Sequence, residues 1–295
     1  MPATKFKCKI LAIDLSSLIF RSFYGLPTSI KDSEGFAING VKGYLETLIR
    51  LKKIYSPEII VHAIDEDWRP KWRTDLLPQY KAHRVIVDNE EEVDDDLERQ
   101  IELLPTILKE LGMQCIGKAN YEADDVLSTI SKQNINTVVV SGDKDLFQIV
   151  NNKRKIFVHL LGKDGGKTYD EIEIKERFGI EANSYLDFAV LKGDSSDGLP
   201  GVKGIGEKTA VSIINNFKTI ENLINNYQNS KVLSTKQKQS IAESIPYLKK
   251  ALKVVKLKDD LKIMINKPKY KDTENVKKRL KKYRIENQIN SLLSN

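Results

Sequence analysis

The chain has 295 residues, of which 40% are hydrophobic and 30% are charged. This balance suits a globular protein with one large domain or two smaller ones. Its longest apolar runs, such as Val138 to Val140, are far shorter than the roughly 20 residues that span a bilayer, and no N-terminal run is long enough for a secretion signal. We therefore expect a cytoplasmic protein without a membrane partner, which acts as a monomer.

The formal net charge of +7 is unevenly distributed along the chain. Residues 198–295 carry 21 Lys and Arg against 8 Asp and Glu, whereas residues 1–197 have a net negative charge. A basic half favours a polyanionic partner, because each phosphate that Lys or Arg neutralises releases condensed counterions. A solvated, lysine-rich helical surface is the alternative interpretation.

Short apolar, β-branched runs alternate with amphipathic helical patterns in the first half of the chain. The runs predict strands at 7–13, 58–64 and 137–140, and the patterns predict helices at 40–55, 97–111 and 123–131. Strands that alternate with helices indicate an α/β domain with a mostly parallel sheet. We place this domain at residues 1–190.

After about residue 180 the strand signal fades, and glycines followed by helical patterns replace it. Helices are expected at 207–216, 235–244 and 247–256, and residues 267–295 are expected to be loosely ordered. We therefore predict a second, helical domain at residues 191–295.

Acidic residues recur where predicted strands end and a helix begins. Asp14, Asp65 and Asp143 each follow a strand, and ligands of parallel sheets bind beyond the carboxyl ends of the strands. Helix capping would explain any one of these acids but not the whole set. The candidate metal ligands are Asp14, Asp65, Glu122, Asp124, Asp125, Asp143, Asp145, Asp194 and Asp197.

Such crowded carboxylates need a counter-charge, because two unit charges ~4 Å apart repel by about 4 kcal/mol at an effective dielectric constant of ~20. The candidate ligands are all oxygens, which favours Mg²⁺, with Mn²⁺ as a substitute. A pair of such ions activates water and stabilises the leaving oxygen of a phosphodiester. His62 and His159 lie in apolar strand patterns and are interpreted as core residues.

Closely spaced glycines at 198–206 lead directly into the helix predicted at 207–216. Glycines let the backbone approach a ligand, and a helix N-terminus attracts anions. A nucleotide-binding loop would need a preceding strand and a Gly-Lys-Ser/Thr triplet, both of which are missing. We interpret the segment as a helix-hairpin-helix that binds the DNA backbone without reading its sequence, with a plain tight turn as the alternative. Its candidate contacts are Gly201, Lys203, Gly204, Gly206, Lys208 and Thr209.

Five motifs occur in an order that resembles the 5′-nuclease family. They are Asp14-Leu15-Ser16-Ser17 with Arg21, Asp65 with Arg73 and Tyr80-Lys81-Ala82-His83-Arg84, Glu122-Ala123-Asp124-Asp125, Ser141-Gly142-Asp143-Lys144-Asp145, and Gly193-Asp194-Ser195-Ser196-Asp197. Over about residues 8–260 the chain is similar to the 5′-to-3′ exonuclease domain of bacterial DNA polymerase I and to its stand-alone relatives, which include the flap endonucleases.

This resemblance implies a PIN-like (Rossmann-like) domain, an arch at about residues 69–110, and a structure-specific nuclease that uses two metal ions. It implies that the nine acids hold the metals and that Lys81 and Arg84 lie on a helix beside the scissile phosphate. Tyr80 would stack on a terminal base, and Arg21 and Arg73 would contact phosphates. The hairpin would hold K⁺. The implied partners are DNA with 5′ flaps, nicks or free 5′ ends, and RNA–DNA hybrids.

The chain also departs from the family pattern. Leu15 replaces the glycine that usually follows the first aspartate, and Asp88 to Glu98 contains eight acidic residues near the arch. We interpret the acidic stretch as a solvated face, since it would repel a threading strand. Two other functions stay open: a PIN-type ribonuclease, and a non-catalytic module that binds branched DNA.

Overall fold

The computed structural model describes residues 7–84, 93–267 and 273–293. One sheet, with the strand order β3-β2-β1-β4-β5-β6, forms the centre of the first domain. Strands β1 to β5 are parallel, and β6 is antiparallel to β5. The strands are β1 Ile10–Asp14, β2 Ile59–Ala63, β3 Gln114–Ile116, β4 Thr137–Ser141, β5 Ile156–Leu160 and β6 Lys167–Tyr169.

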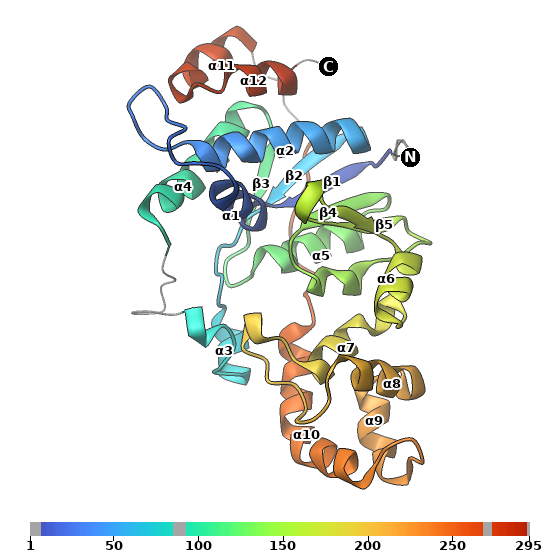
Figure 1. The fold of residues 1–295 in the computed structure, drawn as a ribbon. Coiled ribbons are helices and arrows are strands. Elements are labelled where there is room, and N and C mark those ends of the chain that lie inside the picture. The colour runs from blue at the N-terminus through green and yellow to red at the C-terminus, as the bar shows by residue number, and fades with distance from the viewer. Residues whose placement is uncertain (1–6, 85–92, 268–272, 294–295) are drawn as a thin grey trace.

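Helices cover both faces of this sheet (Figure 1). Leu11 and Ile13 of β1 point to the face covered by α1, α2 and α4, whereas Ile10 and Ala12 point to the face covered by α5. This alternation buries both sides of the strand, as expected for a parallel sheet. The helices up to residue 192 are α1 Leu15–Gly25, α2 Asn39–Tyr55, α3 Lys71–Leu76, α4 Asp95–Glu110, α5 Ala123–Gln133, α6 Glu171–Phe178 and α7 Tyr185–Lys192, of which α3 and α7 contact α10 instead of the sheet.

The chain order of the strands reverses between β1 and β4. The chain passes from β1 outward to β2 and β3, and then returns to place β4 and β5 on the other side of β1. The loops after β1 and β4 therefore diverge, which leaves a crevice at the carboxyl ends of these two strands. Asp14 ends β1 and Asp143 follows β4, so both lie at this switch point.

A helical region lies below the sheet in Figure 1. It consists of α8 Glu207–Phe217, α9 Ile220–Asn226 and α10 Thr235–Val255. The two helices predicted at 235–244 and 247–256 are in fact the single helix α10, which runs through Pro246. The proline leaves one carbonyl without its helical donor, but Ala242 is exposed to solvent, and buried Ile241 and Leu248 hold both halves in the core.

The predicted loose order of residues 267–295 is wrong for residues 273–293. These residues form α11 Thr273–Leu280 and α12 Glu286–Leu293, which lie beside α2 at the end of the molecule opposite α8–α10 (Figure 1). Val276, Ile285 and Ile289 are at most 1% exposed and pack into the core beneath α2. The chain therefore packs its last two helices against the α/β domain.

Within the described ranges, no helix is long and apolar enough to cross a membrane. The two predicted core histidines are buried, with His62 and His159 being 0% and 4% exposed. Tyr44 Oη lies 2.5 Å from His62 Nδ1, and Tyr55 Oη lies 2.7 Å from His159 Nδ1. Each histidine is thus a hydrogen-bonded core residue.

Candidate active site

Hydrogen bonds hold Asp14 in place at the switch point. The backbone N–H of Ser17 donates to Asp14 Oδ1 over 2.9 Å, which caps α1. The hydroxyl of Ser141, at the end of β4, donates to Asp14 Oδ2 over 2.7 Å. Asp14 therefore links the two strands that border the crevice.

A small pocket opens beside this link. Five of the nine predicted metal ligands line it, and they come from the start of α5, the loop after β4 and the turn after α7. The guanidinium of Arg73, the ammonium of Lys81 and the phenol of Tyr80 also line it. The lining residues are Arg73, Tyr80, Lys81, Glu122, Asp124, Asp143, Asp145, Asp197, Val254, Val255 and Leu257.

Asp65 and Asp194 do not line this pocket, but each is fixed next to it. Asp65 accepts hydrogen bonds from Ser16 Oγ over 2.7 Å and from the Ala123 N–H over 2.8 Å, so the end of β2 is tied to the start of α5. Asp194 Oδ1 accepts from the Ser196 N–H over 2.8 Å and caps the turn that carries Asp197.

The carboxylates of the site repel one another in a poorly solvated place. Burial, and next the charge of Asp65, raises the pKa of Asp14 to about 7. Burial followed by the charge of Asp143 raises the pKa of Asp124 and of Asp145 well above the usual aspartate range. The side chains alone thus leave an excess of negative charge in the pocket, which a bound cation would relieve.

Lys81 supplies part of the missing positive charge. Its ammonium forms an ion pair with Glu122 Oε2, and both side chains are nearly buried, at 11% and 6% exposure. Burial alone would raise the pKa of Glu122, but Arg73 and Lys81 lower it below the usual range. Lys81 does not lie on a helix as predicted, because its φ of 50° places it in a turn before residues 82–84.

The donor chemistry of the pocket fits a hard divalent cation. The acidic side chains of the pocket offer only oxygen atoms as ligands. One of these atoms, Asp124 Oδ1, is buried and has no hydrogen-bond partner among the described residues. No three acidic or histidine side chains of residues 7–84, 93–267 and 273–293 already surround one point as ligands. The side chains therefore suit a divalent cation by their oxygen donors and their negative charge. In this structure Glu122 is paired with the ammonium of Lys81.

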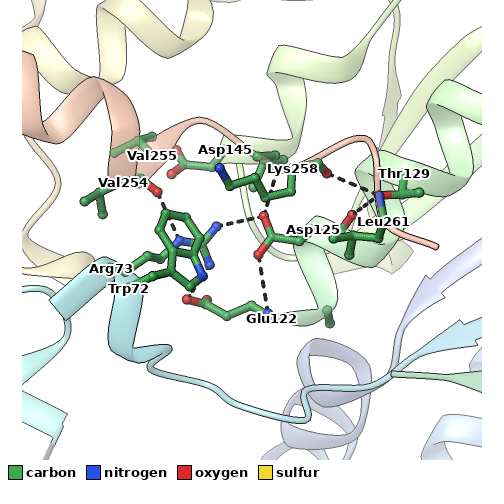
Figure 2. Close-up of polar contacts among 12 residues, drawn as sticks. Trp72, Arg73, Glu122, Asp125, Thr129, Asp145, Val254, Val255, Lys258 and Leu261 are labelled. Carbon is green, nitrogen blue, oxygen red and sulfur yellow. Dashed lines mark hydrogen bonds and ion pairs between the residues drawn. The ribbon is translucent and has the colours of Figure 1, made fainter. Parts of the chain in front are cut away.

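Asp125 and Arg73 form a buried ion pair (Figure 2). Asp125 is 0% exposed, and its Oδ1 accepts from Arg73 Nη2 over 2.9 Å and from the Lys258 N–H over 2.8 Å. Arg73 is 2% exposed, and its Nη1 donates to Glu122 Oε1 over 2.6 Å. Protein groups thus engage the carboxylate of Asp125 and the guanidinium of Arg73, although Arg73 also lines the pocket.

Tyr80 is buried beside this ion pair. Its ring is 4% exposed, and its hydroxyl donates to Glu122 Oε1 over 3.0 Å, so it does not present a face to a terminal base. Arg84 is partly exposed, and it donates to the Ser196 carbonyl over 2.8 Å beside Asp197. Arg21 is exposed, and it donates to the Gly162 carbonyl, which follows β5.

The glycine hairpin has a buried side and an exposed side. Val202 and Ile205 are buried, and the Gly201 N–H donates to Tyr247 Oη over 3.2 Å, so Gly201 serves packing. A side chain at Gly201 would collide with the Lys192 carbonyl at 2.3 Å, which explains the glycine. The remaining candidate contacts face solvent or are half-buried: Lys203, Gly204, Gly206, Lys208 and Thr209.

Two basic residues that the sequence interpretation did not single out lie in a groove next to the site. Lys144 and Lys192 line it together with His83 and Asp194. Their proximity depends on the loop after β4 meeting the end of α7, which no local pattern in the sequence indicates.

The acidic stretch from Asp88 to Glu98 lies partly outside the described residues. Its described part caps α4, because Asp94 accepts from the Asp96 N–H over 2.9 Å.

The fold and the site define the class of protein: a PIN-like α/β nuclease with a helical appendage. The family models for the 5′-3′ exonuclease N-terminal resolvase-like domain and for the 5′-3′ exonuclease C-terminal SAM fold match residues 9–179 and 180–282. The chain belongs to the 5′-3′ exonuclease family. These models divide the chain at residues 179 and 180, whereas the boundary predicted from the sequence is at residue 190.

Individual relatives agree with this assignment. A 5′-3′ exonuclease of Streptomyces coelicolor is 39% identical over 85% of this chain and 86% of its own length. A DNA polymerase I of Mycobacterium bovis is 32% identical over 75% of this chain but only 24% of its own length. Among solved structures, T5 5′-exonuclease with bound zinc ions matches with a TM-score of 0.68 at 20% identity, over 83% of this chain and 88% of its own. The last comparison supports the fold.

Proposed function

We propose that the chain hydrolyses phosphodiester bonds near the 5′ ends and branch junctions of DNA with the help of Mg²⁺, for which Mn²⁺ can substitute. The observation that carries this proposal is an acidic pocket at the sheet's switch point with Lys81 in its wall. Relatives named 5′-3′ exonuclease, and a T5 5′-exonuclease that binds divalent ions, support it.

The ions would be held by Asp14, Asp124, Asp143, Asp145 and their neighbours. Bound there, divalent ions supply a water of lowered pKa and a positive field for the phosphate oxygens. The chain's own cations, Lys81 and Arg84, lie where they can stabilise negative charge that develops on the phosphate. Asp125 is left out of this set because Arg73 and the Lys258 N–H occupy its carboxylate.

The hairpin would hold the duplex beside the cleavage site. Lys203 and Lys208 are exposed on either side of Gly204 and Gly206, at the N-terminus of α8. Such a surface binds phosphates without reading bases, and its carbonyls can share a K⁺ ion with a DNA phosphate. Selection by structure instead of sequence would follow, with flaps, nicks and RNA–DNA hybrids as candidate substrates.

A substrate panel tests the proposal. Equal amounts of 5′-labelled flapped, nicked, single-stranded and RNA–DNA hybrid duplexes are incubated with the protein in Mg²⁺ or in EDTA. We expect cleavage near the junction of the flap, in Mg²⁺ only. Equal cleavage of single-stranded RNA would favour a PIN-type ribonuclease, and junction binding without any cleavage would favour a non-catalytic module; either result would contradict the proposal.

A further inference from the structure

Arg73 connects three parts of the molecule that meet at the acidic pocket (Figure 2). It projects from α3, and its Nη1 and Nη2 donate to Glu122 and Asp125 at the start of α5 over 2.6 and 2.9 Å. Its Nε donates to the Val254 carbonyl in the last turn of α10 over 3.0 Å. All three of its nitrogens are therefore used, and the guanidinium is almost fully buried.

Asp125 is the counter-ion that keeps this guanidinium in place. Its Oδ1 also accepts the Lys258 N–H, just beyond the end of α10, and its Oδ2 lies 3.4 Å from the Glu122 N–H. Both oxygens of Asp125 are thus engaged by protein donors, and the residue is fully buried. A carboxylate held in this way orients its partner instead of a metal ion.

Arg73 orients the carboxylate of Glu122. Arg73 Nη1 and Tyr80 Oη both donate to Oε1, which leaves Oε2 directed at the ammonium of Lys81. Arg73 lines the pocket, but all three of its nitrogens are taken up by protein acceptors, and its guanidinium carbon lies 4.6 Å from the centroid of the Trp72 ring. Its influence on the site therefore passes through Glu122.

We propose that Arg73 is a positioning residue for the nuclease reaction: held by Asp125 and Val254, it fixes the carboxylate of Glu122 and thereby the place of Lys81 in the pocket. This inference rests on the proposed nuclease function. A planar guanidinium can bridge two carboxylates and a carbonyl at once, whereas an ammonium cannot bridge them in the same geometry. The identity of the residue as arginine, and not its charge alone, then matters for the rate.

The test compares Arg73→Lys, Asp125→Asn and Glu122→Gln with the control Arg99→Lys. Arg99, on α4, forms an ion pair with Asp32 over 3.2 Å, but its side chain is 33% exposed and does not line the pocket. Single-turnover cleavage of a flap substrate gives the rate constant, fluorescence anisotropy gives the substrate Kd, and calorimetry gives the Mn²⁺ affinity. Circular dichroism at a temperature well below each variant's Tm establishes that the variants compared are folded.

We expect Arg73→Lys to lower the rate constant by about 10- to 100-fold, with the substrate Kd unchanged within about twofold. The double variant Arg73→Lys/Glu122→Gln should be no slower than Glu122→Gln, because both changes act through one carboxylate. Arg99→Lys should cleave like the wild type. Asp125→Asn should retain the wild-type Mn²⁺ affinity, and it keeps the test decisive if Arg73→Lys does not fold.

Three results would overturn the inference while wild-type cleavage still supports the proposed function. The first is a substrate Kd that weakens with Arg73→Lys at an unchanged rate constant, as for a phosphate contact. The second is a double variant whose losses simply multiply. The third is a Mn²⁺ affinity that falls in Asp125→Asn as it does in Asp143→Asn, since Asp125 would then be a metal ligand. Absence of cleavage by the wild type would instead refute the proposed function itself.

Discussion

Lys81 and Glu122 form an ion pair inside the acidic pocket, where both side chains are nearly buried. The lysine comes from the segment after α3 and the glutamate from the residue before α5, so the pair joins the predicted arch region to the start of α5. In a place where carboxylates outnumber cations, this ammonium is a built-in counter-charge.

Replacement of Lys81 by Met is predicted to have two effects. The cleavage rate should fall by about 10²–10³-fold, as when one preorganised electrostatic group is removed from an active site. The Tm should rise more on addition of Mg²⁺ than it does in the wild type, because the carboxylates have lost their internal cation. Differential scanning fluorimetry with and without Mg²⁺ measures the second effect. Lys132→Met, which removes an exposed lysine paired with Asp259, is the control; an equal Mg²⁺ response in all three proteins would contradict the prediction.

The exposed lysines of the hairpin are predicted to contribute affinity without sequence preference. Lys203→Glu and Lys208→Glu should each weaken duplex binding to a similar extent on unrelated sequences, and lower the slope of log Kd against log salt by roughly 1. Fluorescence anisotropy at several salt concentrations measures both quantities. Lys53→Glu, at the far end of α2, should leave the slope unchanged. A loss confined to one DNA sequence would argue against backbone binding.

His62 is predicted to make the folded protein sensitive to acid. Burial lowers its pKa to about 3, against about 6.5 in an unfolded chain. Between these pH values the unfolded chain binds a proton that the folded protein does not bind. The contribution of His62 to the free energy of unfolding is therefore complete above about pH 6.5. It is lost as the pH falls below that value, by at most about 1.4 kcal/mol per pH unit. The free energy of unfolding of His62→Asn, from urea titrations at pH 4.5 to 7.5, should depend less steeply on pH. Exposed His83→Asn is the control, and wild-type steepness in His62→Asn would refute the prediction.

The last two helices are predicted to be an integral part of the α/β domain. Ile285 is 0% exposed, so Ile285→Ala should lower the free energy of unfolding by about 2–5 kcal/mol. Asn287→Ala, on the exposed side of α12, should change it by less than about 0.5 kcal/mol. Urea denaturation measures both. Equal, small changes would mean that α12 is not packed on α2 in solution.

The central strands and the acidic set could be predicted because their signals are local. The apolar runs of β1, β2 and β4 each lead into an aspartate, and their parallel order brings those residues to one edge. β3 and β6 have three residues each, which is too short for any periodic pattern. In α11 only Val276 and Leu280 are buried, and lysines and an arginine surround them in the sequence. The apolar spacing was therefore too weak to predict this helix.

The buried partners of Arg73, Tyr80 and Asp125 could not be predicted in the same way. Arg73 is 49 residues from Glu122 and 181 from Val254, and only the folded chain brings these groups together. A motif shows that a charged residue is present, but it does not show whether the charge meets a ligand or a buried partner. At this site, burial decides between the two.

Calorimetric titration of the metal-free protein with Mn²⁺ tests the central claim most directly, because it measures whether the acidic pocket takes up divalent ions. We predict a clear binding isotherm for the wild type and at least about tenfold weaker binding by Asp143→Asn, whose carboxylate lines the pocket. No heat of binding to the wild type, or the same affinity in Asp143→Asn, would contradict the account.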